Sequence, residues 1–181
     1  MDSKQAQSVY RWMYLVNYTA FNLLCENVKL NELTNVTVIN CAVYSQKKKI
    51  KFYLNDYPNL INNHYGTVID RIDKFSEKGF NKVVEVEANT LDEILLDNKV
   101  IYDKVKWIKI DVEGAEFEVL KGAKDLLSGS TNLSILIEIH NLSRGNNLNE
   151  EITEYLKKYG FSKTYEERHN SGEAHVIFAK T

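Results

Sequence analysis

The spacing of apolar residues along the chain changes repeatedly between helical and strand-like patterns. Helical spacing is found at residues 19–33 and 149–159, and strand-like runs are found at 36–43, 50–54, 83–86 and 133–139. A further helix is expected after Gly114, because Phe117, Leu120 and Leu127 recur at helical intervals. Alternating helices and strands predict an α/β sheet with helices on both faces.

Three segments define this prediction more closely. Residues 133–139 are almost continuously apolar, which predicts a central parallel strand covered on both faces. Residues 161–165 and 174–179 predict a closing antiparallel pair of strands. Residues 9–16 are apolar enough for either a strand or a helix, and the sequence does not decide between them.

Composition is that of an ordinary globular protein of 181 residues, expected to form a single domain over residues 1–181. The formal net charge of −2 predicts no strong attraction to nucleic acid or to a membrane surface. No apolar stretch approaches the roughly 20 residues of a membrane span, and the N-terminus lacks the layout of a secretion signal. Cys25 and Cys41 are expected to be small buried residues, so a cytoplasmic location is predicted.

The segment 107–123 carries the clearest candidate chemistry, because it predicts a strand, a tight turn and a helix. Asp111 and Glu113 stand where the strand ends, and Gly114 permits a sharp turn. Glu138 and His140 stand at the end of what is expected to be the neighbouring strand. Adjacent strands lie about 4.8 Å apart, so these four side chains are expected to share one cleft. Their spacing is not diagnostic of a metal, and no metal site is assigned.

The same segment, K-I-D-V-E-G-A-E-F-E-V-L-K-G-A, resembles the signature of the FkbM family of methyltransferases, which use S-adenosylmethionine. Residues 22–38, 90–95 and 137–140 resemble other parts of that family in the expected order. The resemblance covers residues 19–181, and residues 1–18 form an atypical N-terminal segment. It implies a Rossmann-like, mostly parallel sheet with a C-terminal antiparallel hairpin. It also implies methyl transfer to a hydroxyl of a sugar, lipid or small metabolite.

The resemblance assigns roles to particular residues. Asp111, Glu113, Glu138 and His140 are the expected catalytic residues, with His140 or a nearby carboxylate as the base. Asn40, Cys41, Ala42 and Asp111 are the expected cofactor-binding residues, and the role of Glu116 stays open.

One part of the family pattern is missing from the sequence. No G-x-G occurs, although a nucleotide-type cofactor needs a turn where backbone can approach it closely. The family's ribose-binding acid would fall near Leu15. We therefore expect an N-terminally truncated member, which is either a methyltransferase, or an inactive domain or one part of a split enzyme. A start-site error, a gene truncation and a completing partner chain or homo-oligomer all stay open as explanations.

Overall fold

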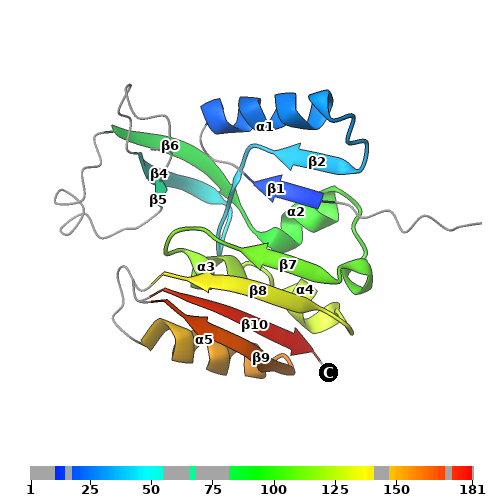
Figure 1. Cartoon of the computed structure of the whole chain (residues 1–181), viewed down its shortest axis with the longest axis vertical. Helices are drawn as coiled ribbons and strands as arrows, with labels where there is room; N and C mark the ends of the chain where they lie inside the picture. Colours follow the sequence, from blue (N-terminus) through cyan, green and yellow to red (C-terminus); the bar gives the residue numbers. More distant parts are fainter. Residues whose placement is uncertain are drawn as a thin grey trace, which may run out of the picture. The chain divides into compact units, whose positions relative to one another are not determined.

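The computed structural model describes residues 11–14, 18–54, 66–67, 82–140, 147–169 and 173–180, and Figure 1 shows their helices and strands. The chain forms two compact units, Met1–Ala42 and Val43–Thr181. Each unit mixes helices with strands, so the predicted α/β class is confirmed. The longest described helix has 13 residues, and none of the described helices is long and apolar enough to cross a membrane.

The N-terminal unit is a β-α-β arrangement. Strand β1 (Arg11–Tyr14) pairs in parallel with β2 (Val36–Ile39), and helix α1 (Tyr18–Leu30) connects them. The ambiguous segment 9–16 therefore contains a strand. Within α1, Phe21, Leu24 and Val28 are half-buried as their spacing predicts, whereas Leu30 at the helix end is 79% exposed. Leu15, which follows β1, lies outside the described residues.

The second unit begins with a small sheet in the order β3-β6-β4-β5. Its strands are β3 (Ala42–Val43), β4 (Lys48–Leu54), β5 (Gly66–Thr67) and β6 (Lys82–Asn89). β4 begins at Lys48, two residues before the strand-like run that the sequence shows at 50–54. Lys49 lies opposite Glu87 on β6, with Nζ and Oε1 3.7 Å apart. Within residues 55–82, the structure describes only Gly66, Thr67 and Lys82.

The larger sheet of this unit has the order β7-β8-β10-β9. Its strands are β7 (Trp107–Ile110), β8 (Ser134–Ile139), β9 (Phe161–Arg168) and β10 (Ala174–Lys180). β7 and β8 are parallel, and β10 is antiparallel to both β8 and β9. The predicted hairpin is confirmed. Of these four strands, β7, β8 and β9 run in one direction and β10, which lies between β8 and β9, is reversed. The sheet is therefore mixed, and the expected mostly parallel sheet is confirmed in part.

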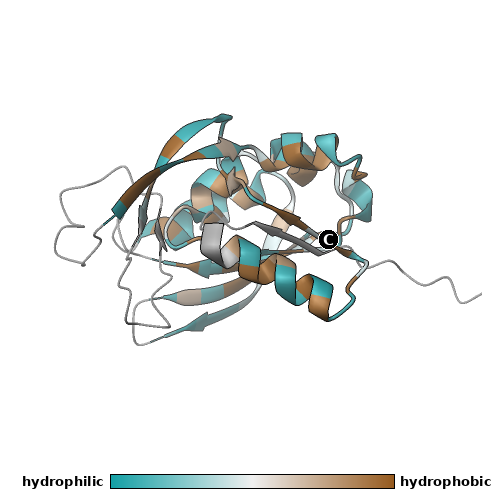
Figure 2. Cartoon of the chain, turned by 90° about the horizontal axis from the view of Figure 1, so that it is seen from above, coloured by the Kyte–Doolittle hydropathy of each residue, from teal (hydrophilic) through white to brown (hydrophobic). Residues whose placement is uncertain are grey.

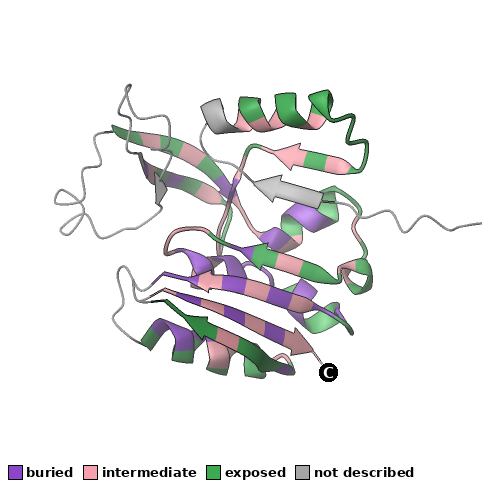
Figure 3. Ribbon diagram, in the orientation of Figure 1, coloured by how far each residue is buried: buried purple, intermediate pink, exposed green. Residues whose placement is uncertain are grey.

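One face of this sheet holds the core. Ile135, Ile137 and Ile139 of β8 are fully buried, while the residues between them are only half-buried, an alternation visible in Figure 3. The prediction that this strand is covered on both faces therefore holds fully for one face and partly for the other. Helix α5 (Leu148–Lys157) buries Ile152 and Leu156 completely, as predicted. Figure 2 shows hydrophobic and hydrophilic residues alternating along the helices, as one-sided burial requires.

Two short helices replace the single helix predicted after Gly114. They are α3 (Glu116–Lys121) and α4 (Lys124–Gly129), and the break falls at Gly122. A Cβ atom at Gly122 would lie 2.2 Å from the carbonyl oxygen of Tyr44, so only glycine fits there. The carboxylate of Asp92, in helix α2 (Leu91–Asp97), accepts hydrogen bonds from the amides of Asp125 and Leu126 at 2.9 Å each. Asp92 thereby caps the N-terminus of α4, although it lies more than 30 residues before that helix in the sequence.

Thr90 caps the N-terminus of α2, as the T-x-x-E pattern predicts. Its hydroxyl accepts a hydrogen bond from the amide of Glu93 at 3.1 Å. The amide of Thr90 itself donates to the side-chain oxygen of Asn89 at 2.9 Å. The side chain of Asn89 therefore accepts the hydrogen bond that the Glu93 side chain would accept in a reciprocal capping box.

Candidate active site

The candidate site lies where the parallel strands β7 and β8 end side by side. Ile110 is in register with Ile137, so Asp111 and Glu138 come next at the same edge of the sheet. His140 follows β8 directly, and Glu113 follows Asp111 in the turn after β7. Asp111, Glu113 and His140 each direct one side-chain atom into a group whose members lie within 4.8 Å of one another. The four predicted catalytic side chains are therefore neighbours, and their catalytic roles stay a prediction.

The turn between β7 and α3 has an unusual backbone. Glu113 has φ 53° and Gly114 has φ 104°, so both lie in the left-handed region. Glycine adopts this conformation freely, but for glutamate it costs on the order of 1 kcal/mol. Strain of this kind at a non-glycine residue is concentrated at functional sites. The turn holds the Glu113 carboxylate beside His140, with Oε2 3.6 Å from Nε2.

Glu116 contacts both the turn and the His140 ring from the first position of α3. Its side chain is fully buried, and its Oε1 lies 2.8 Å from the amide of Gly114 and 2.8 Å from Nδ1 of His140. A carboxylate can only accept hydrogen bonds when ionised, so Nδ1 carries a proton in this contact. Its other oxygen, Oε2, is buried without a hydrogen-bond partner among the described residues. Glu116 therefore fixes both the turn and the imidazole ring.

His140 is held in its protonated form. The hydrogen bond that His140 donates to Glu116 raises its pKa most, burial lowers it, and the charges of Glu116, Glu113 and Glu138 raise it further, to about 9. At neutral pH the ring is thus an imidazolium with Nε2 facing Glu113 and Glu138, at 3.6 and 3.7 Å. This protonation state disfavours the predicted option in which His140 is the base at neutral pH, because an imidazolium has no lone pair to accept a proton.

Glu113 is the better proton acceptor. Burial raises its pKa first, His140 lowers it, and the negative charges of Asp111, Glu116 and Glu138 raise it again. A carboxylate with a raised pKa is a stronger base than an ordinary one. The side chains of Asp111 and Glu113 are equally exposed, at 34% each, but Asp111 is paired with Lys109, whose Nζ lies 2.8 Å from Oδ2. That contact raises the pKa of Lys109 against the opposing effect of burial.

The expected cofactor-binding residues are divided between the two units. Asn40, Cys41 and Ala42 lie in the N-terminal unit, and Asp111 lies in the second. Cys41 donates from Sγ to the carbonyl oxygen of Ala42 at 3.2 Å. Ala42 is buried, whereas Cys41 is half-buried, as is Cys25, so the expected burial of the cysteines is only partial.

S-adenosylmethionine carries a sulfonium cation at one end and an adenosine at the other, and the described residues suit the two ends differently. Among the described residues, the carboxylates Asp111, Glu113, Glu116 and Glu138 lie around Lys109 and His140, and this concentration of negative charge favours a positive charge. No glycine-lined cradle for a nucleotide is found in the described part of the chain. Gly122 is packed against Tyr44, and Gly129 is packed against the ring of Tyr102.

The role of Glu116 was left open by the sequence, although one signal for it was present. It lies three residues after Glu113 in E-G-A-E, at the first position of α3. An acid there is ordinarily explained by the helix dipole alone. Complete burial of the carboxylate and its contact with His140 require a larger role.

Comparison with known protein families decides the identity of the domain. The family model described as the methyltransferase FkbM domain matches residues 6–163, which is most of the chain. The chain belongs to the FkbM family of methyltransferases. The match includes residues 6–18, which the resemblance read from the sequence leaves outside. Neither the curated proteins nor the solved structures gave a significant match.

Proposed function

We propose that this FkbM-family protein transfers a methyl group from S-adenosylmethionine to a hydroxyl of a sugar, lipid or small metabolite. Members of the family generally use this cofactor, which when bound supplies an electrophilic methyl group on sulfur. The observation that carries the proposal is the half-buried Glu113 carboxylate beside the His140 imidazolium. The free cysteines Cys25 and Cys41 are compatible with the cytoplasm as the site of this activity.

Glu113 is the general base in this proposal. Glu113 would accept the proton of an acceptor hydroxyl next to the turn while that oxygen takes the methyl group. The methyl–sulfur bond would break at the same time, and the cofactor would leave as a neutral thioether. Protonated His140 donates from Nε2 toward this region and orients Glu113, while Glu116 holds the ring from its other nitrogen. Asp111 and Glu138 complete the acidic wall around the acceptor.

A second candidate is that this chain is one part of a split enzyme or an inactive member. The sequence contains no G-x-G, and β7 has β8 as its partner on one side only among the described strands. An unpaired strand edge is a place where another strand can add. In this candidate, the acceptor residues are present here, and a partner chain or a second copy supplies the cofactor side.

We also propose that both units belong to one methyltransferase domain. The support is the family match, which runs continuously across the boundary at Ala42.

Titration calorimetry with S-adenosylmethionine separates the two candidates. Saturable binding in the micromolar range supports independent catalysis, and absence of heat at millimolar cofactor refutes it for this chain alone. The base is tested with Glu113→Gln, using cofactor labelled in its methyl group and a panel of sugars and polyols as acceptors. Loss of a general base predicts a decrease of about 10²–10⁴-fold in kcat. Glu118→Gln is the matched control, because Glu118 pairs with Lys121.

The affinity of the Glu113→Gln variant for the cofactor gives a second test. A base acts on the acceptor, and the carboxylates of Asp111, Glu116 and Glu138 still favour the sulfonium charge in this variant. Glu113→Gln is therefore expected to leave cofactor binding within a few-fold of the parent protein. Wild-type turnover in Glu113→Gln would exclude it as the base.

A further inference from the structure

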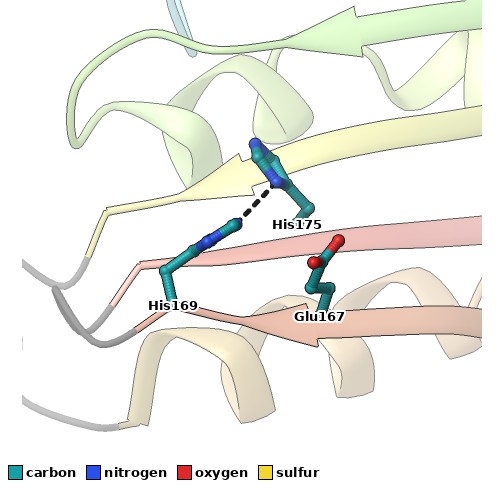
Figure 4. A group of neighbouring side chains, drawn as sticks. All are labelled: Glu167, His169 and His175. Carbon is teal, nitrogen blue, oxygen red and sulfur yellow. Dashed lines mark hydrogen bonds between the residues drawn. The ribbon is translucent and has the colours of Figure 1, made fainter.

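A second cluster of potential ligands lies at the end of the C-terminal hairpin, outside the candidate active site. It consists of Glu167 on β9, His169 just after β9, and His175 on β10, and Figure 4 shows the three side chains together. Each contributes one ligand atom, and these atoms lie within 4.8 Å of one another.

The strand register explains why these residues meet. Glu167 is directly opposite His175 on the neighbouring antiparallel strand. His169 lies two residues beyond Glu167, and residues two apart along extended chain face the same side. The amide of His169 donates to the carbonyl oxygen of Glu173 at 2.9 Å, which extends the hairpin pairing past the end of β9. Backbone pairing therefore positions all three side chains before any ligand is bound.

The two imidazole rings are arranged as paired ligands would be. Nε2 of His169 is 2.9 Å from Nδ1 of His175, and the ring planes are almost perpendicular, at 86°. Two nitrogens bound to one zinc ion at about 2.0–2.1 Å in tetrahedral geometry are separated by roughly 3.3 Å. The two nitrogens therefore need to separate by only a few tenths of an ångström for both to bind one metal ion.

Glu138 supplies the outer-shell contact that histidine ligands usually have. Its Oε2 is 3.1 Å from Nε2 of His175, and the two residues are register partners on β8 and β10. A carboxylate at Nε2 favours the ring form that carries its proton there, which leaves a lone pair on Nδ1. That lone pair points toward His169, where the metal would lie.

We propose that Glu167, His169 and His175 bind a divalent transition metal ion of the zinc class. Two imidazoles and one carboxylate are a ligand set that zinc accepts, and three protein ligands leave a fourth position for water. Glu138 orients His175 without coordinating the metal. The site does not depend on methyl transfer, because none of its three ligands belongs to the proposed base machinery.

Zinc titration of the purified full-length chain by calorimetry tests this site. The expected result for the wild-type chain is one equivalent bound with a dissociation constant in the micromolar range or below. His169→Ala is expected to weaken binding by roughly a hundredfold, because one of three ligands is lost. His169 is exposed and lies outside the strands, so this substitution leaves the core unchanged.

Two further variants sharpen the test. Glu138→Gln is expected to weaken binding about 10–100-fold through the outer shell alone. His64→Ala is the matched control and is expected to bind zinc as the wild type does. Cobalt titration gives an independent readout, because tetrahedral coordination produces visible absorption that His169→Ala should remove.

Three outcomes would overturn the proposal. The first is millimolar affinity in the wild-type chain, which would leave the two rings as a hydrogen-bonded pair only. The second is equal affinity in the wild type and His169→Ala. The third is loss of binding in Glu113→Gln with His169→Ala unaffected, which would move the metal to Asp111, Glu113 and His140.

Discussion

Replacing Glu116 with glutamine removes the buried charge that keeps His140 protonated. The amide has nearly the same shape and can still accept the hydrogen bond from Gly114, so the turn is retained. The largest contribution that raises the His140 pKa is lost, while the opposing effect of burial remains. We expect the pKa of His140 to fall from about 9 toward 6.5 or below.

This shift has a defined effect on stability. The pKa of His140 is higher in the folded protein than in the unfolded chain, so its stabilising contribution is complete below about pH 6.5 and is lost as the pH rises through about 9. A change from 6.5 to about 9 corresponds to about 3 kcal/mol, and to somewhat less at pH 7. Because Glu116 causes most of the rise, Glu116→Gln is expected to cost about 2 kcal/mol at pH 7.

Urea unfolding of both proteins between pH 6 and 10 measures this difference. The stability difference should be largest below pH 7 and should shrink as the pH passes 9. Glu118→Gln is the control on the same helix, because Glu118 pairs with Lys121 at the partly exposed surface and is expected to change stability by less than about 1 kcal/mol. Parallel curves for wild type and Glu116→Gln across this range would refute the reasoning. So would a wild-type His140 signal that titrates near pH 6.5 by NMR.

Two further substitutions test how the second unit is built. Gly122→Ala places a Cβ atom 2.2 Å from the carbonyl oxygen of Tyr44, so we expect a loss of about 1–3 kcal/mol in urea unfolding. Gly129→Ala meets the side chain of Tyr102, with Cδ2 at 3.2 Å, and no backbone atom, so it should cost much less; equal losses would contradict the packing argument. Asp92→Ala leaves the first amides of α4 without their acceptor and should cost about 1–2 kcal/mol, whereas exposed Asp97→Ala should change little. Equal thermal stability of these two aspartate variants would exclude the long-range cap.

The local elements were predictable because their signals are carried by neighbouring residues. The cap at Thr90 and the turn after α5 that ends at Gly160, where φ is 83°, follow directly from short patterns. The break at Gly122 was not predictable, because its causes are the backbone of Tyr44 and the carboxylate of Asp92, both distant in sequence. Helical periodicity continues across that break, so pattern alone joins α3 and α4.

The sequence predicted which residues of the candidate site are neighbours, but it did not predict their protonation states. Strand ends and the motif identified Asp111, Glu113 and His140 as neighbours. The protonation of His140 depends on the buried carboxylate of Glu116, and sequence spacing does not report burial. The proximity of His169 and His175 was not predictable, because it depends on strand register, which the sequence does not display.

The position of β10 between β8 and β9 sets an order of events during synthesis. β7 and β8 can pair as soon as they emerge from the ribosome, but β9 has no place in the sheet until residues 174–180 follow it. A nascent chain that has not reached Ala174 leaves one edge of β8 open, with its buried isoleucines on one face. Completion of this sheet therefore requires β10, the last of its four strands to be synthesised. We expect the sheet to fold late in synthesis and in one cooperative step. Stalled chains of increasing length, probed by proteolysis, would show protection of β8 only after β10 has emerged.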